Sequence, residues 1–167
     1  LREPHPMLRL VQGDVGCGKT IVAALAMAYV VANKYQAALM VPTEVLAGQH
    51  FFNLKNIFEP LGWRVALLTG SLSAKEKREI LSGLASGEIQ ICIGTHALIQ
   101  DEVEFKALAM VVVDEQHRFG VNQRSHLKGK GKMDAGQGDG NQGGSTLNPH
   151  FLVMTATPIP RNFAMTA

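Results

Sequence analysis

The segment from Gly13 to Thr20, Gly-Asp-Val-Gly-Cys-Gly-Lys-Thr, matches the pattern G-x-x-x-x-G-K-[ST] at every defined position. Its glycines let the backbone wrap closely around phosphates with several N–H groups turned inward. An apolar strand precedes the segment and a long apolar helix follows it, so the helix N-terminus faces the bound anion. The alternative is a glycine turn that matches by chance. The strand–loop–helix setting favours a phosphate loop that binds a nucleoside triphosphate.

Within this loop, Lys19 places a positive charge near the β- and γ-phosphates, and the Thr20 hydroxyl can ligate Mg²⁺. We therefore expect Lys19 to take part in catalysis and Thr20 to hold the metal. The residues expected to bind the nucleotide are Gly13, Asp14, Val15, Gly16, Cys17, Gly18, Lys19 and Thr20.

Short aliphatic segments alternate with helical segments along the whole chain, which is typical of a mostly parallel sheet with helices on both faces. The predicted strands cover residues 8–12, 37–41, 64–68, 89–93, 110–113 and 151–154, and the predicted helices cover 20–33, 43–58 and 74–85. Together with the phosphate loop, this order predicts a single α/β domain over 1–167, of the RecA-like P-loop NTPase class. In such sheets the ligand site lies at the carboxyl ends of the strands.

Composition restricts the class of protein further. The chain has 167 residues, of which 46% are hydrophobic, so it is the size of one globular domain. A net charge of +2 is too mild to indicate a polyanion partner by itself. Cys17 and Cys92 do not form a metal-binding spacing, and reduced thiols in a cytoplasmic protein fit them better than a disulfide. The longest apolar run, Ile21 to Ala32, is too short to cross a membrane.

The segment from Lys128 to Pro149 is rich in glycine and almost free of apolar residues. It cannot bury enough surface to offset its ordering entropy, so we expect a flexible glycine-rich insertion over 129–149. A basic nucleic-acid tether through its lysines is the functional alternative. A tolerated insertion is favoured, because lengthening a loop costs little free energy.

Two adjacent carboxylates, Asp114 and Glu115, follow the aliphatic run Val111-Val112-Val113. At the end of a central parallel strand, Asp114 is placed to hold the Mg²⁺ that bridges the phosphates. Glu115 points elsewhere and can act as the general base that polarises the attacking water. Acidic residues also end strands and cap helices, but a complete phosphate loop in the same chain favours catalysis.

Polar side chains after two strands are candidates for coupling the nucleotide site to a neighbouring surface. They are Gln116, His117, Thr155 and Thr157. The threonine hydroxyls could hydrogen-bond Gln116 or His117, although single threonines before a proline are more often turn residues.

Six motifs in order resemble the first motor lobe of superfamily-two helicases, and most closely the RecG-type branched-DNA helicases. The motifs are Gly13–Thr20, Pro42-Thr43-Glu44, Thr69-Gly70-Ser71, Gly94-Thr95-His96, the Asp114–His117 box (Asp-Glu-Gln-His) and Thr155–Pro158. The resemblance spans nearly the whole chain apart from the glycine-rich insertion. It implies an ATP- and Mg²⁺-dependent helicase that remodels branched or duplex DNA in repair and recombination, located in the cytoplasm with the nucleoid and not in a membrane.

The resemblance further implies a DNA track along the outer end of the sheet. Its residues would be Pro42, Thr43, Glu44, Gly70, Ser71, Thr95 and His96. Backbone N–H groups and small hydroxyls at helix N-termini can contact phosphates without reading sequence. Without the resemblance, a helix cap is the favoured interpretation of Thr43, and a turn that of Ser71.

Two other functions remain as alternatives. A transcription-repair coupling translocase is similar in many motifs, but Gln116 and the Thr69-Gly70-Ser71 segment favour the RecG type. A nucleotide-gated DNA clamp would not need a water-activating base such as Glu115. We expect the chain to be part of a larger protein whose second RecA-like lobe and wedge domain lie outside it. The chain alone should therefore hydrolyse little or no ATP.

Overall fold

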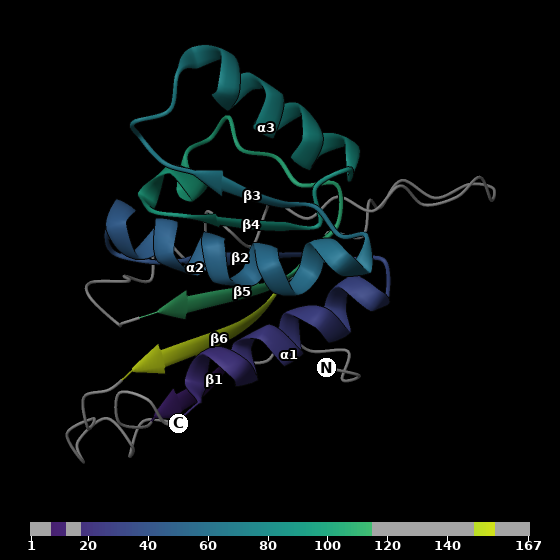
Figure 1. Ribbon diagram of the computed structural model, residues 1–167, viewed down its shortest axis with the longest axis vertical. Helices are drawn as coiled ribbons and strands as arrows, with labels where there is room; N and C mark the ends of the chain where they lie inside the picture. The colour runs from purple at the N-terminus through teal and green to yellow at the C-terminus, as the bar shows by residue number, and fades with distance from the viewer. Residues whose placement is uncertain (1–7, 13–17, 115–148, 156–167) are drawn as a thin grey trace, which may run out of the picture.

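The computed structural model describes residues 8–12, 18–114 and 149–155 of the chain. Its described strands form one sheet in the order β1-β6-β5-β2-β4-β3, and every neighbouring pair is parallel (Figure 1). The strands are β1 (Leu8–Gln12), β2 (Gln36–Met40), β3 (Val65–Leu68), β4 (Ile91–Gly94), β5 (Leu108–Asp114) and β6 (His150–Thr155). The helices are α1 (Lys19–Ala32), α2 (Glu44–Phe58) and α3 (Ala74–Ser86), with short 3₁₀ turns η1 (Glu59–Leu61) and η2 (His96–Ile99).

Helices cover both faces of the sheet, as the alternation of strands and helices predicts. One apolar cluster joins α1 and α2 to side chains such as Leu39, Ile93 and Val112. The other joins α3 and η2 to side chains of the opposite face, such as Cys92 and Val113. Successive strand residues point to opposite faces, so nearly continuous aliphatic strands supply both clusters.

Each helix begins at a residue suited to that position. Gly18 precedes α1 with φ +83° and ψ 18°, a left-handed conformation that L side chains rarely adopt. The Thr43 hydroxyl accepts a hydrogen bond from the Leu46 N–H at 3.3 Å and so caps α2. At the start of α3, Ser73 and Glu76 form a reciprocal capping box.

Gln36 is the first residue of β2 and is buried, with 3% of its surface exposed. Its side-chain amide donates to the carbonyls of Leu84 and Ile89 at 2.9 and 2.7 Å, and its oxygen accepts from the Ala107 N–H at 2.8 Å. A buried polar group is tolerated when its partners are supplied in this way. These bonds tie the start of β2 to the segments that lead into β4 and β5.

Strand and helix boundaries differ from the sequence prediction by a few residues at most. The largest differences are in β4, which covers Ile91–Gly94 instead of 89–93, and in β5, which covers Leu108–Asp114 instead of 110–113. The turns η1 and η2 were not predicted, because each is only one turn long and has no periodicity of its own. Among the described helices, none is long and apolar enough to cross a membrane.

Gly94 is required by the close approach of β4 to β3. A Cβ built on Gly94 would lie 2.3 Å from the backbone carbonyl oxygen of Leu68 and 3.0 Å from the Leu98 side chain. Backbone of a paired strand cannot move aside as a flexible side chain can. The glycine at this end of β4 is therefore a packing requirement.

We predict that Gly94→Ala destabilises the protein by about 2–3 kcal/mol, because the added methyl group must displace a paired strand. Gly48→Ala is the matched control, since a Cβ at Gly48 in α2 has no neighbour within 4 Å. Alanine there is expected to stabilise the helix by roughly 0.5–1 kcal/mol. Denaturant unfolding of both variants measures the two changes, and equal midpoints would contradict the packing argument.

Candidate functional site

The predicted site residues follow the carboxyl ends of the strands, and the order of the strands divides them into two groups. Strands β1, β6 and β5 are neighbours and lead to Lys19, Thr155 and Asp114. Strands β2, β4 and β3 are also neighbours and lead to the segments expected to form the DNA track. We call these two groups the nucleotide half and the DNA half of the carboxyl edge. They meet where β5 pairs with β2.

In the nucleotide half, α1 begins at Lys19, immediately after the phosphate-loop motif. One strand, β6, lies between β1 and β5, so the phosphate-loop strand and the Asp114 strand are about 10 Å apart. Several predicted residues lie outside the described part of the chain: Gly13, Asp14, Val15, Gly16, Cys17, Glu115, Gln116, His117, Thr157 and nearly all of the insertion. Their roles stay predictions.

Asp114 makes a hydrogen bond that the sequence analysis did not anticipate. Its Oδ2 lies 2.8 Å from Nε2 of His50 in α2. The two side chains are 17% and 13% exposed, respectively, so the contact is largely shielded from water. Because a carboxylate only accepts hydrogen bonds, Nε2 of His50 carries the donated hydrogen. The Asp114 carboxyl group is thus held from one side by α2.

His50 could have been noticed from the spacing of residues in α2. The buried residues of this helix, Ala47, Leu54 and Phe58, recur at helical spacing and face the sheet. His50 lies three residues after Ala47 and four before Leu54, and therefore on the same inward face. A polar side chain in an apolar stripe signals a specific partner. The sequence alone does not reveal which residue that partner is.

In the DNA half, a hydrogen bond connects the start of α2 to the loop that follows β3. Oε1 of Glu44 accepts from the backbone N–H of Ser71 at 3.2 Å, and the hydroxyls of Thr69 and Ser71 are 3.2 Å apart. Thr43, Glu44, Gly70 and Ser71 are all exposed. Thr43 also caps α2, as its alternative interpretation predicts. A cap residue can still present its backbone and methyl group to a ligand.

The third segment of the DNA half follows β4. Thr95 precedes η2 but makes no side-chain capping hydrogen bond, and His96 is exposed. Pro42 and Thr95 are partly buried. The structure therefore brings all three expected segments to one edge, with exposed polar groups from each.

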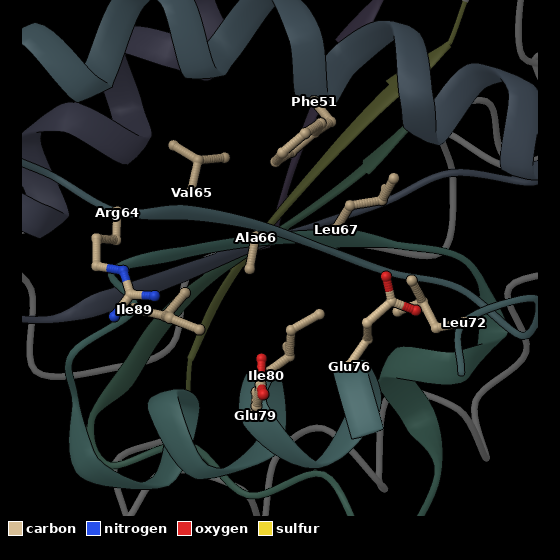
Figure 2. A pocket seen from close by; sticks show the side chains of 10 residues that line it. All are labelled: Phe51, Arg64, Val65, Ala66, Leu67, Leu72, Glu76, Glu79, Ile80 and Ile89. Atoms are coloured by element: carbon tan, nitrogen blue, oxygen red, sulfur yellow. The ribbon is translucent and has the colours of Figure 1, made fainter. Parts of the chain in front are cut away.

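A separate groove of about 300 Å³ runs along the free edge of β3, between α2 and α3 (Figure 2). Phe51 and Ile80 line it from the two helices, and Glu76 and Glu79 stand along the α3 side. Hydrogen bonds from the Ser73 hydroxyl and backbone N–H hold the pKa of Glu76 below its ordinary value. Arg64 also lines the groove, and none of its lining residues belongs to either half of the carboxyl edge.

The thiol of Cys92 lies within β4 and is completely buried. Burial raises the pKa of this thiol to about 12, so it stays protonated and unreactive at neutral pH. Cys92 is therefore a core residue with a free thiol. Among the described residues, no group of three or more His, Cys, Asp and Glu side chains could hold a metal ion.

Comparison with known proteins identifies the family of the chain. The family model described as DEAD/DEAH box helicase matches residues 5–166. The chain belongs to the DEAD/DEAH box helicase family. Among curated relatives of this helicase domain, the ATP-dependent DNA helicase RecG of Streptococcus pneumoniae is 55% identical over all of the chain. RecG of Bacillus subtilis is 53% identical over 99% of it. The chain spans 22% of the length of each of these relatives.

Solved structures give the same result for the helicase domain. A structure of RecG bound to a three-way DNA junction is 42% identical, with a TM-score of 0.76, and covers 98% of this chain and 20% of its own. The helicase Lhr of Mycobacterium smegmatis is 16% identical with a TM-score of 0.63, over 91% of this chain and 19% of its own. The latter likeness supports the fold alone. The RecA-like fold predicted from the sequence is confirmed, as is the resemblance to RecG.

Proposed function

We propose that this chain is the first RecA-like motor lobe of an ATP-dependent DNA helicase that remodels branched DNA, such as forks and Holliday junctions, in repair and recombination. Identity of 51–55% to RecG of several bacteria supports this assignment. A solved structure shows the related RecG bound to a three-way DNA junction. Because the chain spans about a fifth of those relatives, the activity belongs to the longer protein.

One observation carries the proposal. The carboxyl edge of a single rigid sheet presents the start of α1 and Asp114 in one half and three exposed polar segments in the other. A motor must change its hold on DNA when its nucleotide changes. Two binding surfaces on neighbouring strands of one sheet suit that requirement, because parallel strands all direct their following loops to the same edge.

The chain's own residues have separate tasks in this proposal. The backbone of Gly13–Gly18 surrounds the phosphates, and Lys19 offsets their charge. Glu115 polarises the water that attacks the γ-phosphate and accepts its proton. Gln116, His117, Thr155 and Thr157 couple this site to the DNA half. ATP is the substrate.

The described donor groups fit Mg²⁺, which prefers oxygen ligands and keeps several waters. Thr20 is exposed at the start of α1, and His50 engages only Oδ2 of the two Asp114 carboxylate oxygens. Thr20 and Asp114 would hold the ion, with phosphate oxygens and water completing its coordination. When bound, Mg²⁺ neutralises negative charge on the phosphates.

The DNA track would consist of Pro42, Thr43, Glu44, Gly70, Ser71, Thr95 and His96, which contact the phosphate backbone without reading sequence. Partners of the chain would be branched or duplex DNA and, within the same protein, a second RecA-like lobe and a wedge domain. The second lobe would complete the ATP site, which is why we expect the chain alone to turn over ATP barely. We infer a cytoplasmic, nucleoid-associated location from such partners.

We predict that Lys19→Ala lowers kcat for ATP hydrolysis by the full-length protein about 10²–10³-fold, because the lysine charge stabilises the transition state. Lys106→Ala is the control, since Lys106 is exposed and precedes β5 at the opposite edge of the sheet. Steady-state phosphate release measures both variants. Turnover at the wild-type rate in Lys19→Ala would contradict the phosphate-loop assignment.

We predict that Glu115→Gln retains ATP binding but slows hydrolysis about 10²–10⁴-fold, since an amide cannot accept the proton of water. A single-turnover assay with a parallel nucleotide-binding titration separates the two effects. Loss of binding would instead assign Glu115 a structural or metal-holding role. Wild-type hydrolysis in this variant would favour a base elsewhere.

A further inference from the structure

The contact between His50 and Asp114 joins a helix to the carboxylate that we assign to the metal. The Nε2–Oδ2 distance of 2.8 Å is that of a well-formed hydrogen bond to a charged acceptor. Both side chains are more than four-fifths buried, so water competes weakly for either partner. Such a bond restricts the rotation of the Asp114 side chain and determines which of its oxygens faces outward.

The alternation of side chains in β5 explains why these residues meet. Met110 and Val112 belong to the cluster that α1 and α2 cover, whereas Val111 and Val113 belong to the opposite cluster. Asp114 continues the first series and therefore points to the side of the sheet where α2 lies. A hydrophobic residue at position 50 would suit the inward stripe of α2, but it would leave this carboxylate without a partner.

Helix α2 also contacts the DNA half through its first residue. Glu44, the first residue of the helix, accepts the hydrogen bond from Ser71. His50 follows less than two helical turns later, a distance of about 9 Å along the axis. One rigid element therefore contacts both the loop after β3 and the last residue of β5.

We propose that His50 is a positioning residue for Asp114. Its Nε2–H holds Oδ2, which would leave Oδ1 as the oxygen that could hold Mg²⁺, and it ties the orientation of the carboxylate to the position of α2. This inference rests on the proposed function. His50 does not touch the nucleotide in this assignment. It acts only through Asp114.

The first experiment compares His50→Ala, His50→Gln and the control Asn53→Ala in the full-length protein. Asn53 is exposed on the same helix, one turn further on. We expect His50→Ala to raise the Mg²⁺ concentration for half-maximal ATP hydrolysis, or to lower the DNA-stimulated kcat, about 10–100-fold. The DNA concentration that gives half-maximal stimulation should not change. His50→Gln should recover part of the loss, since its amide can donate near the position of Nε2, and Asn53→Ala should resemble wild type.

The second experiment needs neither Mg²⁺ nor turnover. Thermal unfolding is measured for His50→Ala, Asp114→Ala and the double variant in EDTA, together with binding of a fluorescent ADP analogue without Mg²⁺. We expect the two shifts in Tm to be non-additive, because each single variant removes the same bond. Mg²⁺-free ADP binding by His50→Ala should match wild type.

Several results would overturn the role of His50. In the first experiment, these are a wild-type Mg²⁺ dependence and kcat in His50→Ala, or no recovery of activity in His50→Gln. In the second, they are additive shifts in Tm, or a loss of Mg²⁺-free ADP binding by His50→Ala as large as its loss of activity. A wild-type protein that hydrolyses no ATP in the presence of DNA would instead overturn the proposed function. The non-additivity of Tm would still report the bond in that case, so the two failures are distinguishable.

Discussion

The parallel pairing of β5 with β6 on one side and β2 on the other is the constraint on which the rest of the structure depends. Parallel strands need crossover connections, and these helices bury both faces of the sheet. The same polarity sends the loop after every strand to one edge. Residues far apart in sequence, such as Lys19 and Asp114, therefore lie at a single edge. The direction of the strands brings them there, and no direct contact between them is needed.

The order of the strands then decides which residues become neighbours at that edge. β6 lies between β1 and β5, and β4 lies between β2 and β3, so the edge divides into a nucleotide half and a DNA half. Helix α2 crosses between them, because it leaves the end of β2 and passes over the face to which Asp114 points. Glu44 and His50 of this helix are hydrogen-bonded to Ser71 and to Asp114, so one helix contacts both halves.

Much of the fold could be predicted because its signals are local. The aliphatic strands, the cap at Thr43 and the glycine before α1 each express a preference of a few consecutive residues. Family motifs indicated the candidate site because the phosphate loop and the acidic pair have fixed spacings. The turns η1 and η2 lacked such a signal, as did the requirement for glycine at position 94, which arises from the approach of a different strand.

The sequence by itself determined the elements, the parallel class of the sheet and the chemistry available at its carboxyl edge, since these follow from side-chain type and short-range spacing. Only the tertiary structure decided that His50 meets Asp114 and that Glu44 meets Ser71. Each of these contacts joins residues on different elements, whose separation depends on strand order and helix placement. No local preference encodes that geometry, because it arises from packing the whole sheet at once.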